Sequence, residues 1–324
     1  MLSTKSRERV RSSVPWWVKF GLKLALVPAS YDLLRAMSLA GHGGMRRPDF
    51  AHDVFRRHYD DADFHRKAGG FSVLEIGPGD ALTAAVVARA YGAASTCHVD
   101  VAPFATPDVA VYQSVARFLS ERCLPAPDLS VAHSLEDVLT ACGGRYETGG
   151  LDSLRALPDA SFDLIYSNGV LQCIPPLQLL ATLKETRRLL HPRGVSVHSV
   201  DLRDMAGQSL HHLRFPERVW ESALFRRAGF HTNRLRYGEW TGLFREAGFE
   251  VRESEVNRWP ALPVRRESLA APFRNLPEDE LLVATFRVAL FPVAADRARG
   301  GAEAVDESDA RAATGAVAGA VTTA

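Results

Sequence analysis

The sequence predicts an α/β fold in which helices cover a doubly wound, mostly parallel sheet. An apolar segment runs directly into a glycine-containing turn at residues 73–80, and short apolar segments then alternate with helical ones. This alternation implies parallel strands joined by right-handed crossovers. With 324 residues, 46% of them hydrophobic, the chain is long enough to build such a core with extensions.

Apolar segments of strand length predict the sheet, although the third strand is not located by any clear segment. The alternating pattern within residues 283–288 favours antiparallel pairing at a sheet edge. The predicted strands cover residues 71–76, 97–101, 162–167, 195–200, 249–256 and 281–290.

Helical periodicity predicts the covering elements, the last of which stops at Gly248. The predicted helices cover residues 48–59, 82–91, 111–119, 135–141, 178–190 and 240–247.

A helical cap is expected to precede the sheet, over residues 15–65, after a disordered N-terminus at residues 1–14. Apolar residues at 17, 20, 24 and 27 share one helical face. Lys19 and Lys23 argue against a secretory signal, and the apolar run is too short to cross a bilayer. We expect this amphipathic helix to cap the sheet domain, with a membrane surface or a dimer contact as the alternatives.

The sheet domain is expected to span residues 66–293, with an insertion at about residues 201–239 after the fifth strand. This insertion is rich in aromatic, arginine and histidine residues, which suits a cover over a polar ligand. Residues 294–324 lack bulky side chains and are expected to form a disordered tail.

Charge and cysteine content exclude several functional classes. The chain has 39 basic and 38 acidic residues, which argues against general nucleic-acid binding. Its four cysteines lack the spacing of a zinc site or a disulfide framework, so we expect free thiols, no metal and a cytoplasmic location.

The strongest functional signal is the string Glu75-Ile-Gly77-Pro-Gly79-Asp80. Gly77 permits a tight turn, and Gly79 lets the backbone approach a ligand closely. Asp100 closes the second predicted strand, where its carboxylate can reach the two hydroxyls of a ribose. These residues together predict a pocket for an adenosyl cofactor.

Two residues argue against a dinucleotide as that cofactor. Leu82 stands where the dinucleotide fingerprint requires a third small residue. Glu75 would lie unfavourably near a pyrophosphate, whereas it suits a ligand that carries an ammonium and a sulfonium.

The glycine string resembles motif I of the class I S-adenosylmethionine-dependent methyltransferases of small-molecule type. The resemblance continues in order through residues 150–154, 162–171 and 189–194, and covers about residues 45–290. It implies a Rossmann-like sheet of seven strands and S-adenosyl-L-methionine as cofactor, with S-adenosyl-L-homocysteine as product. The cofactor-binding residues that it implies are Glu75, Gly77, Gly79, Asp80, Asp100, Val101, Asp152, Ser153, Leu154, Ser167, Asn168 and Gly169.

The chain departs from its relatives after the fourth strand, where many of them carry a histidine. Gln172 and Cys173 stand there, so no catalytic role is transferred to that position. Polar residues of this segment and of the insertion are candidates for substrate binding. They are Gln172, Arg203, His211, Arg214, Asn233 and Arg234.

His198 and Asp201 are the candidate catalytic residues, because ligands bind beyond the carboxyl ends of parallel strands. A hydroxyl acceptor needs a general base, and a histidine oriented by an aspartate is the common solution. His198 has the alternative of packing within the strand end, and Asp201 that of pairing with Arg203. Asn233 and Arg234 have the alternative of anchoring the insertion.

The expected function is methyl transfer to a hydroxyl group of a secondary metabolite or sugar. The alternatives are N-methylation of a small amine, held by Tyr166, Asn168 or Gln172, and a non-catalytic partner subunit that binds S-adenosylmethionine. The expected partner is a small-molecule substrate, without nucleic acid or stable membrane insertion, and a homodimer is possible.

Overall fold

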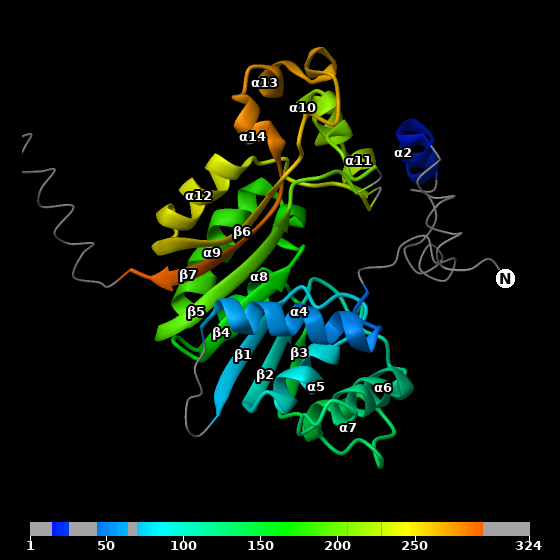
Figure 1. Ribbon diagram of the computed structural model, residues 1–324, viewed down its shortest axis with the longest axis vertical. Coiled ribbons are helices and arrows are strands. Elements are labelled where there is room, and N and C mark those ends of the chain that lie inside the picture. Colours follow the sequence, from blue (N-terminus) through cyan, green and yellow to red (C-terminus); the bar gives the residue numbers. More distant parts are fainter. Residues whose placement is uncertain (1–14, 26–43, 64–69, 206, 228, 294–324) are drawn as a thin grey trace, which may run out of the picture.

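The computed structural model describes residues 15–25, 44–63, 70–205, 207–227 and 229–293. The predicted disordered ends, residues 1–14 and 294–324, therefore lie outside the described residues. The described chain forms a seven-stranded sheet of order β3-β2-β1-β4-β5-β7-β6, which confirms the predicted fold class (Figure 1). The strands are β1 Phe71–Ile76, β2 Ala93–Val99, β3 Gly144–Glu147, β4 Phe162–Asn168, β5 Leu190–Asp201, β6 Phe249–Arg258 and β7 Val283–Pro292.

One strand was not located from the sequence, and one strand prediction was wrong. The third strand, β3, has the sequence Gly-Arg-Tyr-Glu and pairs only with β2, so it lies at an edge and carries no apolar run. The last strand was expected at the other edge, but β7 is antiparallel to both β5 and β6 and lies between them. β6 is the edge strand instead, and most of its residues are partly or fully exposed.

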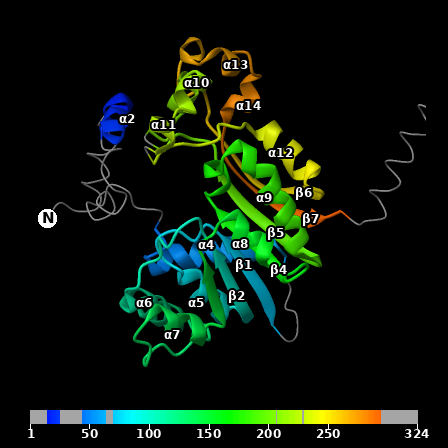
Figure 2. The same ribbon diagram turned by 180° about the vertical axis from the view of Figure 1, so that it is seen from behind.

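Helices cover both faces of the sheet, as Figures 1 and 2 show from opposite sides. α4, α5, α6 and α7 pack on one face, and α8, α9 and α12 on the other, each layer with its own apolar cluster. The helices are α2 Trp16–Ala25, α4 Pro48–Asp61, α5 Thr83–Ala90, α6 Val109–Ser120, α7 Leu135–Ala141, α8 Leu151–Ala156, α9 Pro176–Leu189, α10 Glu217–Trp220, α11 Ala223–Arg227, α12 Tyr237–Glu246, α13 Ala271–Arg274 and α14 Glu278–Leu282. Short 3₁₀ turns are η1 Leu171–Cys173, η2 His211–Arg214 and η3 Arg266–Ser268.

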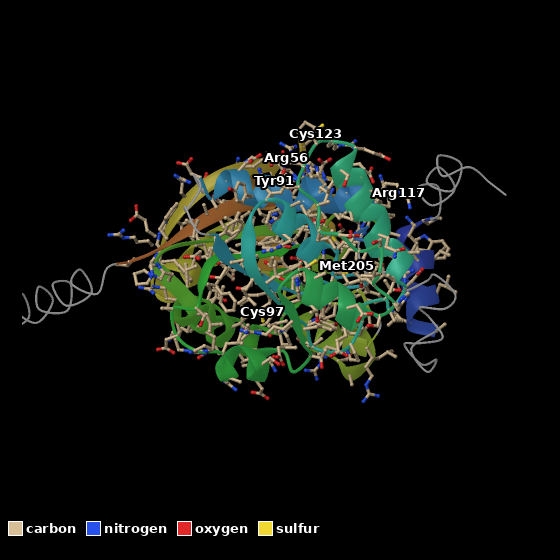
Figure 3. The ribbon with its side chains drawn as sticks, turned by 90° about the horizontal axis from the view of Figure 1, so that it is seen from below. Arg56, Tyr91, Cys97, Arg117, Cys123 and Met205 are labelled. Carbon is tan, nitrogen blue, oxygen red and sulfur yellow. The ribbon has the colours of Figure 1, made fainter. Side chains whose placement is uncertain are left out.

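The cysteines form no disulfide among the described residues, and all four are free thiols. Cys97 and Cys123 lie well apart in Figure 3. The described part of the chain also contains no group of three or more potential metal-binding side chains. None of its helices combines the length and the apolarity that crossing a membrane requires.

A cap stands over one end of the sheet and is built from more of the chain than the sequence predicted. α2 packs on the insertion, where Phe20 contacts the cluster of Trp220, Phe225 and Phe230. A second apolar cluster joins the insertion to the connection between β6 and β7. It contains Leu210, Leu213, Val264, Leu269 and Leu281.

Arg236 fastens this cap to the sheet. Its side chain is fully buried and donates hydrogen bonds to backbone carbonyls from two distant segments, Leu202 O at 3.1 Å and Val283 O at 2.7 Å among them. Further bonds reach the carbonyls of Glu280 and Leu281 in α14. Burial lowers the pKa of Arg236 to about 10, although the guanidinium stays charged at neutral pH.

Replacing Arg236 with alanine should strongly destabilise the protein, because buried carbonyls would lose their donors at about 1–3 kcal/mol each. We expect the melting temperature to fall by about 6–12 °C in differential scanning calorimetry. The control is Arg218→Ala, which removes an exposed arginine from α10 of the same cap. Equal melting temperatures for the two variants would contradict the anchoring role of Arg236.

Candidate functional site

The predicted cofactor residues meet where β1 and β2 end. The amide of Gly77 donates to Val99 O at 2.8 Å, and the amide of Gly79 donates to Asp100 Oδ2 at 3.1 Å. The amide of Val101 donates to Asp100 Oδ1 at 2.7 Å. The structure therefore places the Asp100 carboxylate directly beside the glycine turn.

Gly77 is required by its surroundings. Its φ of 72° lies in the left-handed region, and a Cβ at this position would come within 2.5 Å of both methyl groups of Val170. Gly79 has a similar φ of 73°. The turn after β1 therefore contacts the turn after β4, and both turns belong to the predicted cofactor site.

An adenosyl group fits the residues at this position. Val101 follows Asp100 and leaves 73% of its surface exposed, so an apolar side chain lies open beside the Asp100 carboxylate. Gly150, at the start of α8, donates its amide to Asp100 O at 2.8 Å and closes the side of this position. Asp100 would hold the ribose hydroxyls, and Val101 would contact the adenine.

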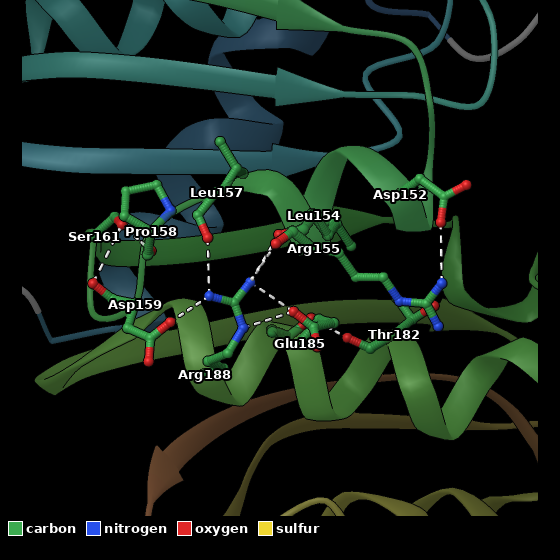
Figure 4. Close-up of polar contacts among 11 residues, drawn as sticks. Asp152, Leu154, Arg155, Leu157, Pro158, Asp159, Ser161, Thr182, Glu185 and Arg188 are labelled. Atoms are coloured by element: carbon green, nitrogen blue, oxygen red, sulfur yellow. Dashed lines mark hydrogen bonds and ion pairs between the residues drawn. The ribbon is translucent and has the colours of Figure 1, made fainter.

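The segment after β3 is split between the surface and the core. Asp152 is exposed and pairs with Arg155 at 3.0 Å, as Figure 4 shows. Ser153 Oγ accepts a hydrogen bond from the Gly149 amide at 2.9 Å, and the side chain of Leu154 is buried in the core. Arg188 of α9 holds α8 from below by donating to Leu154 O at 3.0 Å (Figure 4). The side chain of Leu154 therefore supports the segment from the core.

Glu75 lies inside the protein beneath the glycine turn. Its carboxylate is buried and accepts a hydrogen bond from His98 Nδ1 at 2.7 Å, across the β1–β2 pairing. The other ring nitrogen of His98 lies 3.2 Å from Thr96 Oγ1. The sequence analysis did not identify His98. Its position two residues before Asp100 places it on the neighbouring strand β2, in register with Glu75.

The end of β4 contributes backbone rather than core side chains. The amide of Gly169 donates to Ser199 O at 2.8 Å, and Gly169 has a φ of 69°. Asn168 is partly exposed beside it, whereas Ser167 is fully buried and faces the sheet interior. Asp80 of the glycine turn is 3.8 Å from Arg46 in an ion pair.

The predicted catalytic pair of His198 and Asp201 does not form. His198 is fully buried, with Nδ1 2.8 Å from Ser167 Oγ and Nε2 2.7 Å from Ser196 Oγ. Asp201 binds Arg203 instead. Side chains three positions apart on a strand point to opposite faces, so His198 and Asp201 diverge. With both ring nitrogens engaged inside the core, His198 has no nitrogen left to act on a substrate.

Burial keeps two histidines of the sheet uncharged. It lowers the pKa of His198 to about 3, with a smaller contribution from the neighbouring His58. Burial also lowers the pKa of His58 to about 4. His58 lies in α4, where Nδ1 is 2.7 Å from Val54 O and Nε2 is 3.1 Å from Ser199 Oγ. These imidazoles are structural hydrogen-bonding groups that join α4, β4 and β5.

Two of the predicted substrate residues are taken up within the cap. The side-chain amide of Asn233 donates to Leu171 O at 3.0 Å and to Ile174 O at 3.2 Å, which anchors the insertion on η1. Arg234 is buried, donates to Phe215 O at 2.7 Å and lies over the ring of Trp220. Asn233 and Arg234 therefore anchor the insertion, which was the alternative to substrate binding.

His211 and Arg214 lie against the N-terminal helix. The ring of His211 stacks on Trp16 with centroids 4.5 Å apart, and the Arg214 guanidinium lies 5.1 Å from the Trp16 ring. Burial lowers the pKa of His211. Asp204, which is buried, accepts the amides of Ser209 and His211 at 3.1 Å each and shapes the turn that carries them.

Gln172 and Arg203 remain as candidates at the substrate side. Gln172 is buried, and its Oε1 makes no hydrogen bond within the described residues. Arg203 forms a bidentate pair with Asp201, both bonds being 2.8 Å, and both side chains are partly exposed.

Cys173 lies near this pair. Crowding by protein atoms, and then the charge of Asp201, raise the pKa of the Cys173 thiol to about 12, although the residue is exposed to solvent.

The sheet order and the glycine-turn site define a class I methyltransferase fold that binds S-adenosylmethionine. Residues 47–254 match the family described as "Methyltransferase domain", and the chain belongs to this family. No curated protein matches the chain.

Solved structures that match this chain include three proteins of low sequence identity. YcgJ from Bacillus subtilis has 15% identity over 75% of this chain and 99% of its own, with a TM-score of 0.43. An S-adenosylmethionine-dependent methyltransferase from Mesorhizobium loti has 18% identity over 75% and 99% of the two chains, with a TM-score of 0.42. An arsenic(III) S-adenosylmethionine methyltransferase from Chlamydomonas reinhardtii has 22% identity over 71% and 67%, with a TM-score of 0.38.

Gly77→Ala should abolish or greatly weaken cofactor binding, because the new methyl group would push the β1 turn away from Val170. Isothermal titration with S-adenosylhomocysteine should show at least about a tenfold loss of affinity, the equivalent of about 1.4 kcal/mol. Gly242→Ala is the matched control, since a Cβ there meets no atom within 4 Å. Unchanged affinity of Gly77→Ala would refute the close contact of the two turns.

Acidification should destabilise the protein through its buried histidines. Their folded pKa values lie below the 6.5 of an ordinary histidine, so the unfolded chain binds protons that the folded chain excludes. The free energy of unfolding is therefore highest above pH 6.5. It decreases as the pH falls toward 4, by about 1.4 kcal/mol per pH unit for each histidine. The free energy of unfolding, measured with urea at several pH values, should fall less steeply with decreasing pH in His198→Asn than in the wild type. It should fall as in the wild type in the exposed His133→Asn variant. The same pH dependence in His198→Asn as in the wild type would mean that His198 is charged in the fold.

Proposed function

We propose that the protein methylates a hydroxyl group of a small polar molecule, such as a sugar or a secondary metabolite. The observation that carries this proposal is the partly exposed Asp201–Arg203 pair at the end of β5. It combines a hydrogen-bond acceptor and a donor at the sheet edge where ligands of parallel sheets bind. A hydroxyl group can donate its proton to such a carboxylate while its oxygen stays free to attack.

The backbone between the two residues is held in place. The amide of Leu202 donates to Ala284 O of β7 at 2.9 Å, and Leu202 O accepts the bond from Arg236 at 3.1 Å. The amide of Arg203 also donates to Asp201 Oδ1 at 2.9 Å. The pair is therefore preorganised, which is the property that an in-line transfer requires.

S-adenosylmethionine supplies an electrophilic methyl group on its sulfonium. Asp100 and the glycine turn would hold the adenosyl part, while Asp201 would orient the acceptor hydroxyl and receive its proton. The guanidinium of Arg203 would hold the Asp201 carboxylate in place and would bind a second oxygen of the acceptor. In this assignment Asp201 takes the role for which the sequence suggested His198.

N-methylation of a small amine is the second candidate, and Gln172 favours it. Its buried Oε1 lacks a partner among the described residues and could accept an N–H bond from an amine. A neutral amine needs no general base before it attacks. Tyr166 cannot serve this chemistry directly, because its side chain is buried against Phe55 and His58.

Turnover of Asp201→Asn separates the two candidates. Purified protein would be incubated with S-adenosylmethionine and panels of hydroxylated and amine compounds, with products identified by mass spectrometry. For a hydroxyl acceptor we expect kcat to fall by about 100-fold in Asp201→Asn, with cofactor affinity retained. Glu278→Gln, which breaks an exposed ion pair with Arg266, is the control. Methylated amines formed at an undiminished rate by Asp201→Asn would replace the hydroxyl proposal by the amine one.

A further inference from the structure

The N-terminal helix α2 leaves an apolar face exposed. Trp16 and Phe20 point into the cap, where Phe20 is buried in the aromatic cluster. At 100° per residue, Trp17 borders the packed side of the helix, and Leu22 lies on its outer side. Trp17 is 62% exposed and Leu22 is 54% exposed. α2 thus has apolar residues on both its packed and its outer side, unlike an ordinary surface helix.

α11 lies beside α2 and extends this surface. Phe225 of α11 and Phe20 of α2 pack in the same cluster, and both ribbon views show the two helices close together (Figures 1 and 2). Leu224, the neighbour of Phe225, is 49% exposed. We refer to the exposed side chains of Trp17, Leu22 and Leu224 together as the α2–α11 surface.

Basic residues accompany the α2–α11 surface. Arg226 and Arg227 are exposed on α11, and Lys19 is partly exposed on α2. The sequence immediately before α2 adds further positive charge, with four basic residues and one acidic residue among residues 3–13. The chain as a whole has a net charge of +1.

We propose that the α2–α11 surface docks reversibly on anionic lipid membranes. Tryptophan and leucine side chains partition into the boundary between headgroups and acyl chains, and lysines and arginines are attracted to anionic headgroups. No described helix is long and apolar enough to span a membrane, so the contact is peripheral.

A second copy of the chain would fit this surface less well. A two-fold interface places the same patch opposite itself, so Lys19, Arg226 and Arg227 would meet an equally basic patch. Like charges that face each other disfavour association. An anionic lipid surface satisfies the apolar and the basic residues together.

Vesicle flotation of the full-length protein tests the proposal. We expect the protein to float with vesicles of phosphatidylcholine mixed with phosphatidylglycerol, and to stay behind with phosphatidylcholine alone or at high salt. The double variant Trp17→Ala/Leu22→Ala should lose about tenfold or more in partitioning, and Arg226→Glu/Arg227→Glu should also weaken it. Leu177→Ala is the matched control, because Leu177 is 98% exposed on the distant α9.

Two results would overturn the proposal. Either the Trp17→Ala/Leu22→Ala variant floats as well as the wild type, or the wild type does not float at all. If the wild type does not float, light scattering should be used to measure its oligomeric state. A dimer that dissociates in the Trp17→Ala/Leu22→Ala variant would show that a second copy of the chain occupies the surface. Binding of S-adenosylhomocysteine, measured by titration, checks that each variant is folded. Neither flotation nor this titration requires a methyl acceptor, so the test does not depend on the proposed function.

Discussion

The contact between Gly77 and Val170 is the constraint on which the cofactor site depends. It holds the turns after β1 and β4 so close that no Cβ fits between them. Around this contact, Gly79 and Val101 donate their amides to Asp100, and Gly150 binds the Asp100 carbonyl. Two of these amides fix the Asp100 carboxylate, and the third fixes its main chain. A larger residue at position 77 would disturb all of these bonds at once, because they share the same short turns.

The substrate side is built by a different kind of interaction. Arg236 is buried and binds main-chain carbonyls of the segment after β5 and of the segment that leads into β7. The carbonyl of Leu202 is among them, so the anchor of the cap also fixes the short loop that carries Asp201 and Arg203. Stability of the cap and geometry of the proposed acceptor site are therefore linked through one side chain. The buried charge is tolerated because both Nη atoms of the guanidinium donate to main-chain carbonyls.

The polar groups inside the sheet divide into structural and functional sets. Glu75 with His98, and His198 with two serines, are hydrogen-bonded within the interior and support the strands. Asp100, Gln172 and the Asp201–Arg203 pair lie at the strand ends, where ligands of parallel sheets bind. In the proposed assignment, the cofactor would bind at the ends of β1 and β2, and the substrate at the ends of β4 and β5. The aromatic cap that joins α2 to the insertion lies beyond the proposed substrate site and carries the basic, apolar surface.

The sequence by itself determined the fold class, most strands and helices, the glycine turn and its carboxylate at Asp100. These features depend on local backbone preference and on short apolar patterns, which neighbouring residues encode. The tertiary structure alone decided which side chains meet. β3 lies at an edge of the sheet and carries no apolar run. β7 lies between β5 and β6, so β6 forms the other edge. Arg236 meets carbonyls more than 30 residues away in both directions along the chain. His198 and Asp201 looked like a pair, but the two-residue period of the strand turns them to opposite faces, and only packing shows that His198 is sealed between two serines.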